Sequence, residues 1–163
     1  MSVMLPPELS KFLGMIGFEW PEGDEDKIFD WAQRWTAYAG EVDTLVTSLR
    51  GARDGIAAEN QGPALEAYTK AFSQENGVDD VTKNLAVAGN ITGGCLMLIG
   101  AAVIALKIAF VVNLVSFAIQ VASAIAAAVP TAGASMSWIP IARLIAQKAI
   151  EFAINLGIEK LLG

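Results

Sequence analysis

The sequence predicts an all-α fold, an elongated helical bundle, on three observations. Apolar residues between Ile28 and Ile56 recur in alternating steps of three and four, which is the spacing of one face of a long helix. Glycine and proline separate this segment from later ones at positions that end or start helices. The second half is strongly apolar, since Lys107 is the only charged residue from Ile91 to Val129. A chain of 163 residues is long enough to bury the core of one domain.

A short helix is expected first, within residues 4–18, where apolar side chains share a helical spacing. Pro6 and Pro7 suit its first turn, because backbone N–H groups at that position have no partner within a helix. Gly17 and the turn at residues 20–23 then end this helix.

A long amphipathic helix follows and is expected to end near Ala58. Asp24 is placed to cap its start, and Glu25 and Asp26 fall in the first turn, where the helix dipole favours solvated carboxylates. One face of this helix has the spacing of a coiled-coil seam, which we expect to pack against other helices. The seam consists of Ile28, Trp31, Trp35, Tyr38, Val42, Leu45, Leu49, Ala52 and Ile56.

A turn after the long helix predicts a helical hairpin. The turn consists of Asn60, Gln61, Gly62 and Pro63. Pro63 can begin a new helix, in which Tyr68 and Phe72 stand at helical spacing. We expect this second helix to fold back along the first and cover the seam, to which Tyr68 and Phe72 then belong. Another helical pattern starts at residues 78–80.

Two interpretations fit the apolar segment from Ile91 to Val129. It is long enough to span a bilayer as a tilted helix or a pair of helices. A stripe of polar residues on one helical face is typical of a bundle helix instead. The stripe consists of Asn113, Ser116, Gln120 and Ser123. We favour a helix buried in the bundle and keep membrane insertion or pore formation by residues 91–129 as the alternative.

A last helix is expected to open at residues 138–140, with Pro140 in its first turn. More than half of its circumference is apolar, so it needs contacts on several sides, from the apolar segment or from a second chain. We expect a hairpin with its N-terminal helix in residues 1–90 and an apolar segment in residues 91–163 that packs on it, as one continuous domain. The missing polar cap at Gly163 favours a natural protein that continues further.

Composition excludes most catalytic and metal chemistry. Histidine is absent, and the single cysteine, Cys95, lies in an apolar run where we expect a buried side chain without a chemical role. The motifs of hydrolases, phosphate-binding loops and zinc proteases are also absent. The formal net charge of −6 repels nucleic acid. We therefore expect no catalytic residue, metal, cofactor or nucleic-acid partner.

The hairpin resembles the WXG family of type VII secretion substrates. The resemblance rests on a long amphipathic helix, a tight glycine-containing turn and a second helix with small and aromatic residues. The turn keeps Gly62, whereas Asn60 replaces the family's Trp. Residues 4–6 and 18–21, with the Ala- and Ile-rich tail, are similar to the WXG-like N-terminal leader domain of actinobacterial polymorphic toxins. This similarity covers nearly the whole chain.

The resemblance implies a non-catalytic export and interaction module that type VII (Esx-type) secretion machinery recognises. A separate C-terminal domain, which this chain lacks, would carry the toxic enzyme. The implied partners are small WXG-type helical proteins or a second copy of the chain. The family's export signal is a Tyr followed four residues later by an acid, but Val42 follows Tyr38 and Phe72 follows Tyr68. This departure favours a partner that supplies the signal.

The N-terminal sequence and the resemblance together predict where the protein is located. Residues 1–10 carry no basic cluster, and no long apolar region follows before charged residues resume, so we expect no cleavable secretory signal. Export to the medium or the cell surface would then use a leaderless type VII route, with a cytoplasmic stage before export. A structural bundle that stays in the cytoplasm is the remaining alternative.

Overall fold

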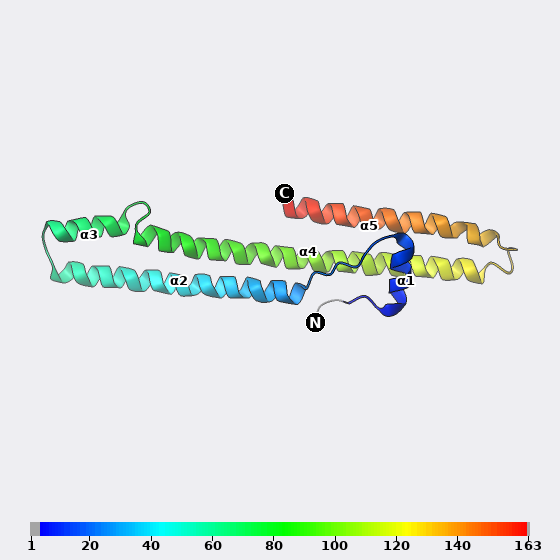
Figure 1. Cartoon of the computed structure of the whole chain (residues 1–163), viewed down its shortest axis with the longest axis horizontal. Coiled ribbons are helices and arrows are strands. Elements are labelled where there is room, and N and C mark those ends of the chain that lie inside the picture. The colour runs from blue at the N-terminus through cyan, green and yellow to red at the C-terminus, as the bar shows by residue number, and fades with distance from the viewer. Residues whose placement is uncertain (1–3, 163) are drawn as a thin grey trace. The chain divides into compact units, whose positions relative to one another are not determined.

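The computed structural model describes residues 4–162, and every regular element in this range is helical (Figure 1). The predicted all-α fold is confirmed. The expectations for residues 1–3 and for the chain end at Gly163 lie outside the described residues. Contacts divide the chain into a hairpin unit, residues 27–97, and a core unit, the described parts of residues 1–26 and 98–163. This division differs from the boundary expected at residue 90, because the N-terminal segment groups with the C-terminal helices.

The hairpin unit contains nearly all of α2 (Glu25–Glu59), together with α3 (Pro63–Ser73) and the first part of α4 (Val78–Ala126). In this unit α2 and α4 run antiparallel and side by side, and α3 occupies only the end of the hairpin (Figure 1). The helix that returns along most of α2 is therefore α4. It begins at Val78, well before the apolar segment, and continues into that segment without a break as far as Ala126.

Small residues let the backbones of α2 and α4 approach closely. Ala32 and Ala39 of α2 are buried, as is Ala86 of α4. A Cβ atom added to Gly93 would lie 2.6 Å from Thr36 Oγ1, and one added to Gly89 would lie 3.1 Å from the Ala39 Cβ. A side chain at either position would force neighbouring atoms of α2 to shift, so the close contact of the helices favours glycine there.

Backbone conformation explains the two turns of the hairpin unit. Gly62 has a φ of 107°, which favours glycine, and Pro63 is the first residue of α3. Asn76, at the end of the second turn, has a φ of 61°, a conformation that asparagine tolerates better than most residues. Phe72 is buried beneath the Arg53 guanidinium, which lies 5.3 Å from the ring centroid. The hairpin end is therefore closed by an aromatic ring and an arginine.

The core unit combines α1 (Pro7–Ile16), the second part of α4, the 3-10 helix η1 (Ala134–Ser137) and α5 (Trp138–Leu162). In this unit α5 folds back along α4, and α1 crosses them (Figure 1). One hydrophobic cluster joins α1, α4 and α5. Its buried members are Leu13, Ile16, Phe110, Leu114, Phe117, Val121, Ala142, Ala146 and Ile150.

Aromatic rings form the centre of this cluster. Phe12 of α1 meets Phe117 edge to face, with ring centroids 5.9 Å apart, and Phe18 and Trp20 both meet Phe110 in the same way. Gly17 ends α1 in the left-handed conformation, and the Gln147 side chain of α5 donates a hydrogen bond of 2.7 Å to the Ile16 carbonyl. Both apolar packing and a polar contact thus hold α1 to the helices beneath it.

The expectation that Ile91 to Val129 is buried within the bundle was wrong. One helical stretch of the described residues, which ends at Ala126, is long and apolar enough to cross a membrane. The most apolar window of 18 residues in it has a mean hydropathy of 2.6, and only 17% of that window is buried. The physical reason is that each part of α4 meets a single long neighbour, which covers one side of a helix that is apolar all round.

Candidate functional site

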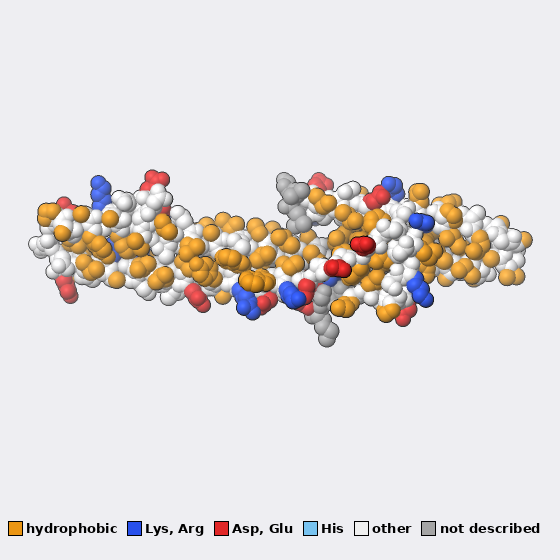
Figure 2. Space-filling model, viewed as in Figure 1, with side chains coloured by type: hydrophobic (Ala, Val, Ile, Leu, Met, Phe, Trp, Pro, Cys, Tyr) orange, Lys and Arg blue, Asp and Glu red, His pale blue; other side chains and the backbone are white. Residues whose placement is uncertain are grey.

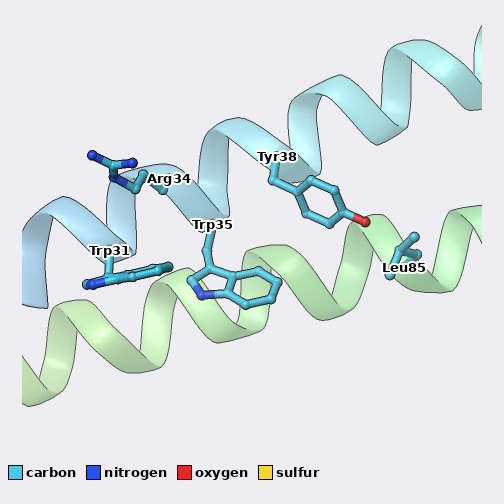
Figure 3. Close-up of a pocket in the computed structure, with 5 residues that line it drawn as sticks. All are labelled: Trp31, Arg34, Trp35, Tyr38 and Leu85. Atoms are coloured by element: carbon cyan, nitrogen blue, oxygen red, sulfur yellow. The ribbon is translucent and has the colours of Figure 1, made fainter.

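The hairpin unit exposes a group of large apolar side chains, which we call the aromatic face. It consists of Trp31, Trp35 and Tyr38 of α2 and Leu85 of α4, which line a shallow hollow of about 320 Å³ with Arg34 at its rim (Figure 3). Trp31 is 56% exposed, and Trp35, Tyr38 and Leu85 are each exposed by more than a third. More exposed apolar residues continue along both helices at helical spacing. They are Leu45 and Ile56 on α2 and Val78 and Val81 on α4.

The structure divides the predicted seam between the inside and the outside of the hairpin. Val42 and Phe72 are buried and Ile28 and Leu49 are half-buried. The exposed members are Trp31, Trp35, Tyr38, Leu45, Ala52, Ile56 and Tyr68. The expectation that the second helix covers the seam was therefore wrong. The face of α2 that packs within the unit consists of Ala32, Ala39, Val42 and Val46, because small residues permit the close approach that tryptophan would prevent.

The aromatic face is locally ordered by its own contacts. The rings of Trp35 and Tyr38 meet edge to face with centroids 5.9 Å apart, and both point toward α4 in Figure 3. Arg34 Nε donates to Asp30 Oδ2 at 2.8 Å one turn away. The hollow is thus lined by apolar rings with one cation beside it, and this chemistry suits an apolar side chain from another molecule.

An ion pair fixes the register of α2 against α4 near the end of the hairpin. Arg50 donates to both carboxylate oxygens of Asp79, from Nε at 2.5 Å and from Nη2 at 2.9 Å. These hydrogen bonds lower the pKa of Asp79 below its ordinary value and raise the pKa of Arg50. Both groups are in contact with solvent, so the pair sets the geometry more than it stabilises the fold.

A buried ion pair lies in the core unit and was not predicted. Lys107 Nζ is 2.6 Å from Glu25 Oε2 and also donates to the Gly23 carbonyl at 2.6 Å. The two side chains are only 2% and 3% exposed, and Lys107 Nζ lies 5.9 Å from the Trp20 ring centroid. Glu25 was expected to be solvated, but its side chain is buried. The available signal was the lone charge in an apolar segment, because such a charge needs a partner of opposite sign.

The predicted polar stripe of α4 forms hydrogen bonds within α4 and with Trp138 at the start of α5. Asn113 donates to the Ala109 carbonyl at 2.8 Å, and Gln120 donates to Ser116 Oγ at 3.4 Å. Trp138 Nε1 in turn donates to Gln120 Oε1 at 3.2 Å. Ser123 is exposed. These contacts satisfy polar groups locally and present no shared ligand site.

Cys95 is exposed, so the expectation of a buried side chain was wrong. It lies on α4 in the hairpin unit, on a part of the helix that no neighbour covers. Among residues 4–162, no group of three or more His, Cys, Asp or Glu side chains is arranged to hold a metal ion. The chemical character of the site is therefore that of an apolar contact surface.

Comparison with known proteins gives one match. A family model described as the WXG100 like domain matches residues 5–149, which is most of the chain. The matched range contains the whole aromatic face, the turn at residues 60–63 and the apolar segment of α4. No curated protein and no solved structure matches the chain.

Proposed function

The chain belongs to the WXG100-like domain family, and we propose on this basis that its aromatic face binds a small helical partner of the same family. The family consists of helical proteins related to type VII secretion, which are generally non-enzymatic. Its members typically pair with other WXG-type or helical proteins. The observation that carries the proposal is the exposure of Trp31, Trp35 and Tyr38 together on one side of the hairpin.

Three neighbouring aromatic side chains that are partly exposed favour the binding of a partner at this face. Full burial of a large apolar side chain is worth about 1.5–3 kcal/mol, and each partly exposed side chain of this face forgoes a part of that free energy. Trp and Tyr are also the residues that most often dominate binding energy at protein interfaces. The face lies on two antiparallel helices, so a partner helix laid along them would contact both. The fitting occupant is an amphipathic helix with an apolar stripe and an acid near Arg34.

The finer role that we propose is that of the export module of a type VII-secreted toxin or effector. Family membership and the resemblance to toxin leader domains support this role. In it, the bound partner supplies the export signal that Tyr38 and Tyr68 lack, because neither is followed by an acid four residues later. The protein would then reach the medium or the cell surface by a leaderless route as part of a complex.

Co-expression tests the proposal. The chain is produced with each small WXG-type protein encoded beside it, and complexes are separated by size exclusion. We expect a complex with one of these proteins, and a loss of affinity of at least about thirtyfold in the Trp35→Ala variant, as for an interface hot spot. The Gln33→Ala variant changes an exposed polar residue of the same helix and is the matched control.

Two results would argue against this function. If the chain stays monomeric with every such protein, the proposed partner is wrong. If Trp35→Ala and Gln33→Ala weaken a complex equally, the aromatic face is not the binding surface. Self-association of the chain alone through the same face would replace the small partner by a second copy. Absence of the protein from the culture supernatant of a strain with intact type VII secretion would favour a structural cytoplasmic bundle.

A further inference from the structure

The connection between α4 and α5 in the core unit is free of charge. From Ile108 to Ala142 the sequence contains no Asp, Glu, Lys or Arg. The first charged residue beyond it is Arg143, which is exposed, and the last before it is Lys107, which is paired with Glu25 in the interior. Figure 2 shows that the surface at this end of the α4–α5 hairpin carries only hydrophobic and uncharged groups.

The part of this stretch at the turn, residues 125–141, is called the hairpin tip. Its large apolar side chains are directed outward. They are Ile125, Val129, Met136, Trp138 and Ile141, and Val129 is 91% exposed. The core cluster reaches the tip only through Ile139, which packs against it, and the five side chains named above are between 42% and 91% exposed.

Most backbone N–H groups of the turn donate hydrogen bonds within the turn itself. Backbone N–H groups of residues 127, 128, 131–134 and 136 donate to carbonyls of residues 123–133 at 2.8–3.3 Å. Thr131 donates to the Ala127 carbonyl at 2.6 Å, Ser135 to the Ala124 carbonyl at 2.7 Å and Ser137 to the Ala134 carbonyl at 2.7 Å. Turns that face water also form such bonds, and in hydrocarbon they become a requirement, because no water is present to replace them.

The hairpin unit offers an internal comparison at its own turn. Residues 59–62 are Glu59, Asn60, Gln61 and Gly62, which are polar or backbone-exposing, and α3 carries Glu66 soon after. The turn at residues 59–62 and the hairpin tip thus differ in charge and side-chain polarity, although both connect helices. The difference favours contact of the hairpin tip with an apolar surrounding.

We propose that the hairpin tip inserts into one leaflet of a lipid bilayer. Trp138 marks the boundary with the headgroups, where tryptophan is enriched in membrane proteins. Arg143, which lies further from the turn on α5, sets the depth, because its charge stays among the headgroups while the turn before Trp138 lies in the acyl region. As the first charge behind the tip, it also favours anionic lipid.

The unequal arms of the hairpin argue for shallow insertion. The charge-free part of α4, from Ile108 to Ala126, is about 28 Å long, close to the ~30 Å of the hydrocarbon core. The charge-free part of α5, from Trp138 to Ala142, is only about 8 Å long. Because Arg143, Lys148 and Glu151 follow on α5, the hairpin as a whole enters to about one leaflet and does not span.

Flotation with vesicles tests the insertion on the full chain. Vesicles made of equal parts of phosphatidylcholine and phosphatidylglycerol are mixed with the protein and separated on a density gradient. We expect the protein to float, and Val129→Asp to lower the vesicle-bound fraction about tenfold, since a charge would enter the acyl region. Gln61→Asp places the same charge on the other turn and should float like the parent, as should Val81→Asp beside the aromatic face.

A second measurement keeps the test valid if Val129→Asp is poorly folded. In a Cys95→Ser background, a polarity-sensitive fluorophore is attached to a cysteine at position 129 or, as a control, at position 61. We expect a blue shift on vesicle addition at position 129 alone, and stronger quenching by a shallow lipid-borne quencher than by one at the bilayer centre.

Four results would overturn the inference. They are failure of the parent to float, equal loss in Val129→Asp and Gln61→Asp, deeper quenching at the bilayer centre, or a blue shift at position 129 on concentration of the protein without lipid. The last result would identify a second copy of the chain as the occupant. The inference does not depend on the proposed function, because Trp35→Ala removes partner binding without touching the tip and Val129→Asp does the reverse.

Discussion

The hairpin unit and the core unit are built from the same kind of helix but differ in the side chains that form the contact between their helices. In the core unit, Phe110 and Phe117 are buried and meet other aromatic rings. In the hairpin unit, alanine and glycine form the contact between the helices, while Trp31 and Trp35 face solvent. The size of the side chains in the contact, not the number of helices, decides how large a core each unit has.

Burial of large side chains provides most of the free energy that holds helices together, so the two units should differ in stability. A contact made of small residues buries little area, although it fixes the spacing of the helices closely. The hairpin unit therefore has a defined shape with little core, and the core unit has a larger core. We expect the first to gain stability from a partner and the second to fold without one.

Removal of a core ring should have the largest effect. Phe117 is fully buried and packs against Phe12, so Phe117→Ala should destabilise the protein by about 4 kcal/mol. The neighbouring Ile119 is 60% exposed, and Ile119→Ala should cost less than about 1 kcal/mol. Denaturant unfolding followed by circular dichroism measures both. Similar losses of unfolding free energy in the two variants would mean that Phe117 does not lie in a packed core.

A side chain at the small-residue contact should have an intermediate effect. In Gly93→Leu the new Cβ would stand 2.6 Å from Thr36 Oγ1 and 3.0 Å from the Ala32 carbonyl oxygen, so α2 and α4 must move apart at a cost of about 2 kcal/mol. Gly94→Leu is the matched control, because no atom lies within 4 Å of a Cβ at that position. Thermal unfolding compares the two variants. Equal midpoints would contradict the close approach of the helices.

Acid should have the smallest effect, through the pair of Arg50 and Asp79. The pKa of Asp79 is lowered in the folded protein, because Arg50 donates hydrogen bonds to its carboxylate, so the pair stabilises the fold above the ordinary aspartate pKa of about 3.9. That contribution is lost as the pH falls below this value and the carboxylate is protonated. The thermal midpoint of Asp79→Asn should thus lie slightly below that of the parent at neutral pH and merge with it in acid. A gap that persists in acid would assign the effect to another cause.

Much of the fold could be predicted from the sequence because helix boundaries depend on local signals. Pro7, Pro63 and Gly17 stand at the helix ends where proline and glycine are expected. The side that α2 turns inward could not be predicted in the same way. Hydrophobic spacing selected the aromatic stripe, whereas Gly89 and Gly93 on a distant part of the chain select the alanine stripe.

The buried pair of Glu25 and Lys107 was missed for a similar reason. The two residues are far apart in the sequence, and each taken alone has an ordinary explanation, at a helix start for Glu25 and as a polar interruption for Lys107. Only the fold shows that they meet. Pairings of this kind depend on long-range geometry, which periodicity does not contain.

Chemical labelling beside the aromatic face tests the central claim, that this face is a binding surface. Cysteine replaces Val81, which is exposed beside the face, or Gln33 in a Cys95→Ser background, so that Trp31, Trp35 and Tyr38 stay in place. The rate of thiol alkylation is measured with and without the co-expressed small WXG-type protein. We expect fast labelling at both positions in the free protein and strong protection at position 81 alone in the complex. Labelling at position 81 that stays equally fast in a stable complex would contradict the claim.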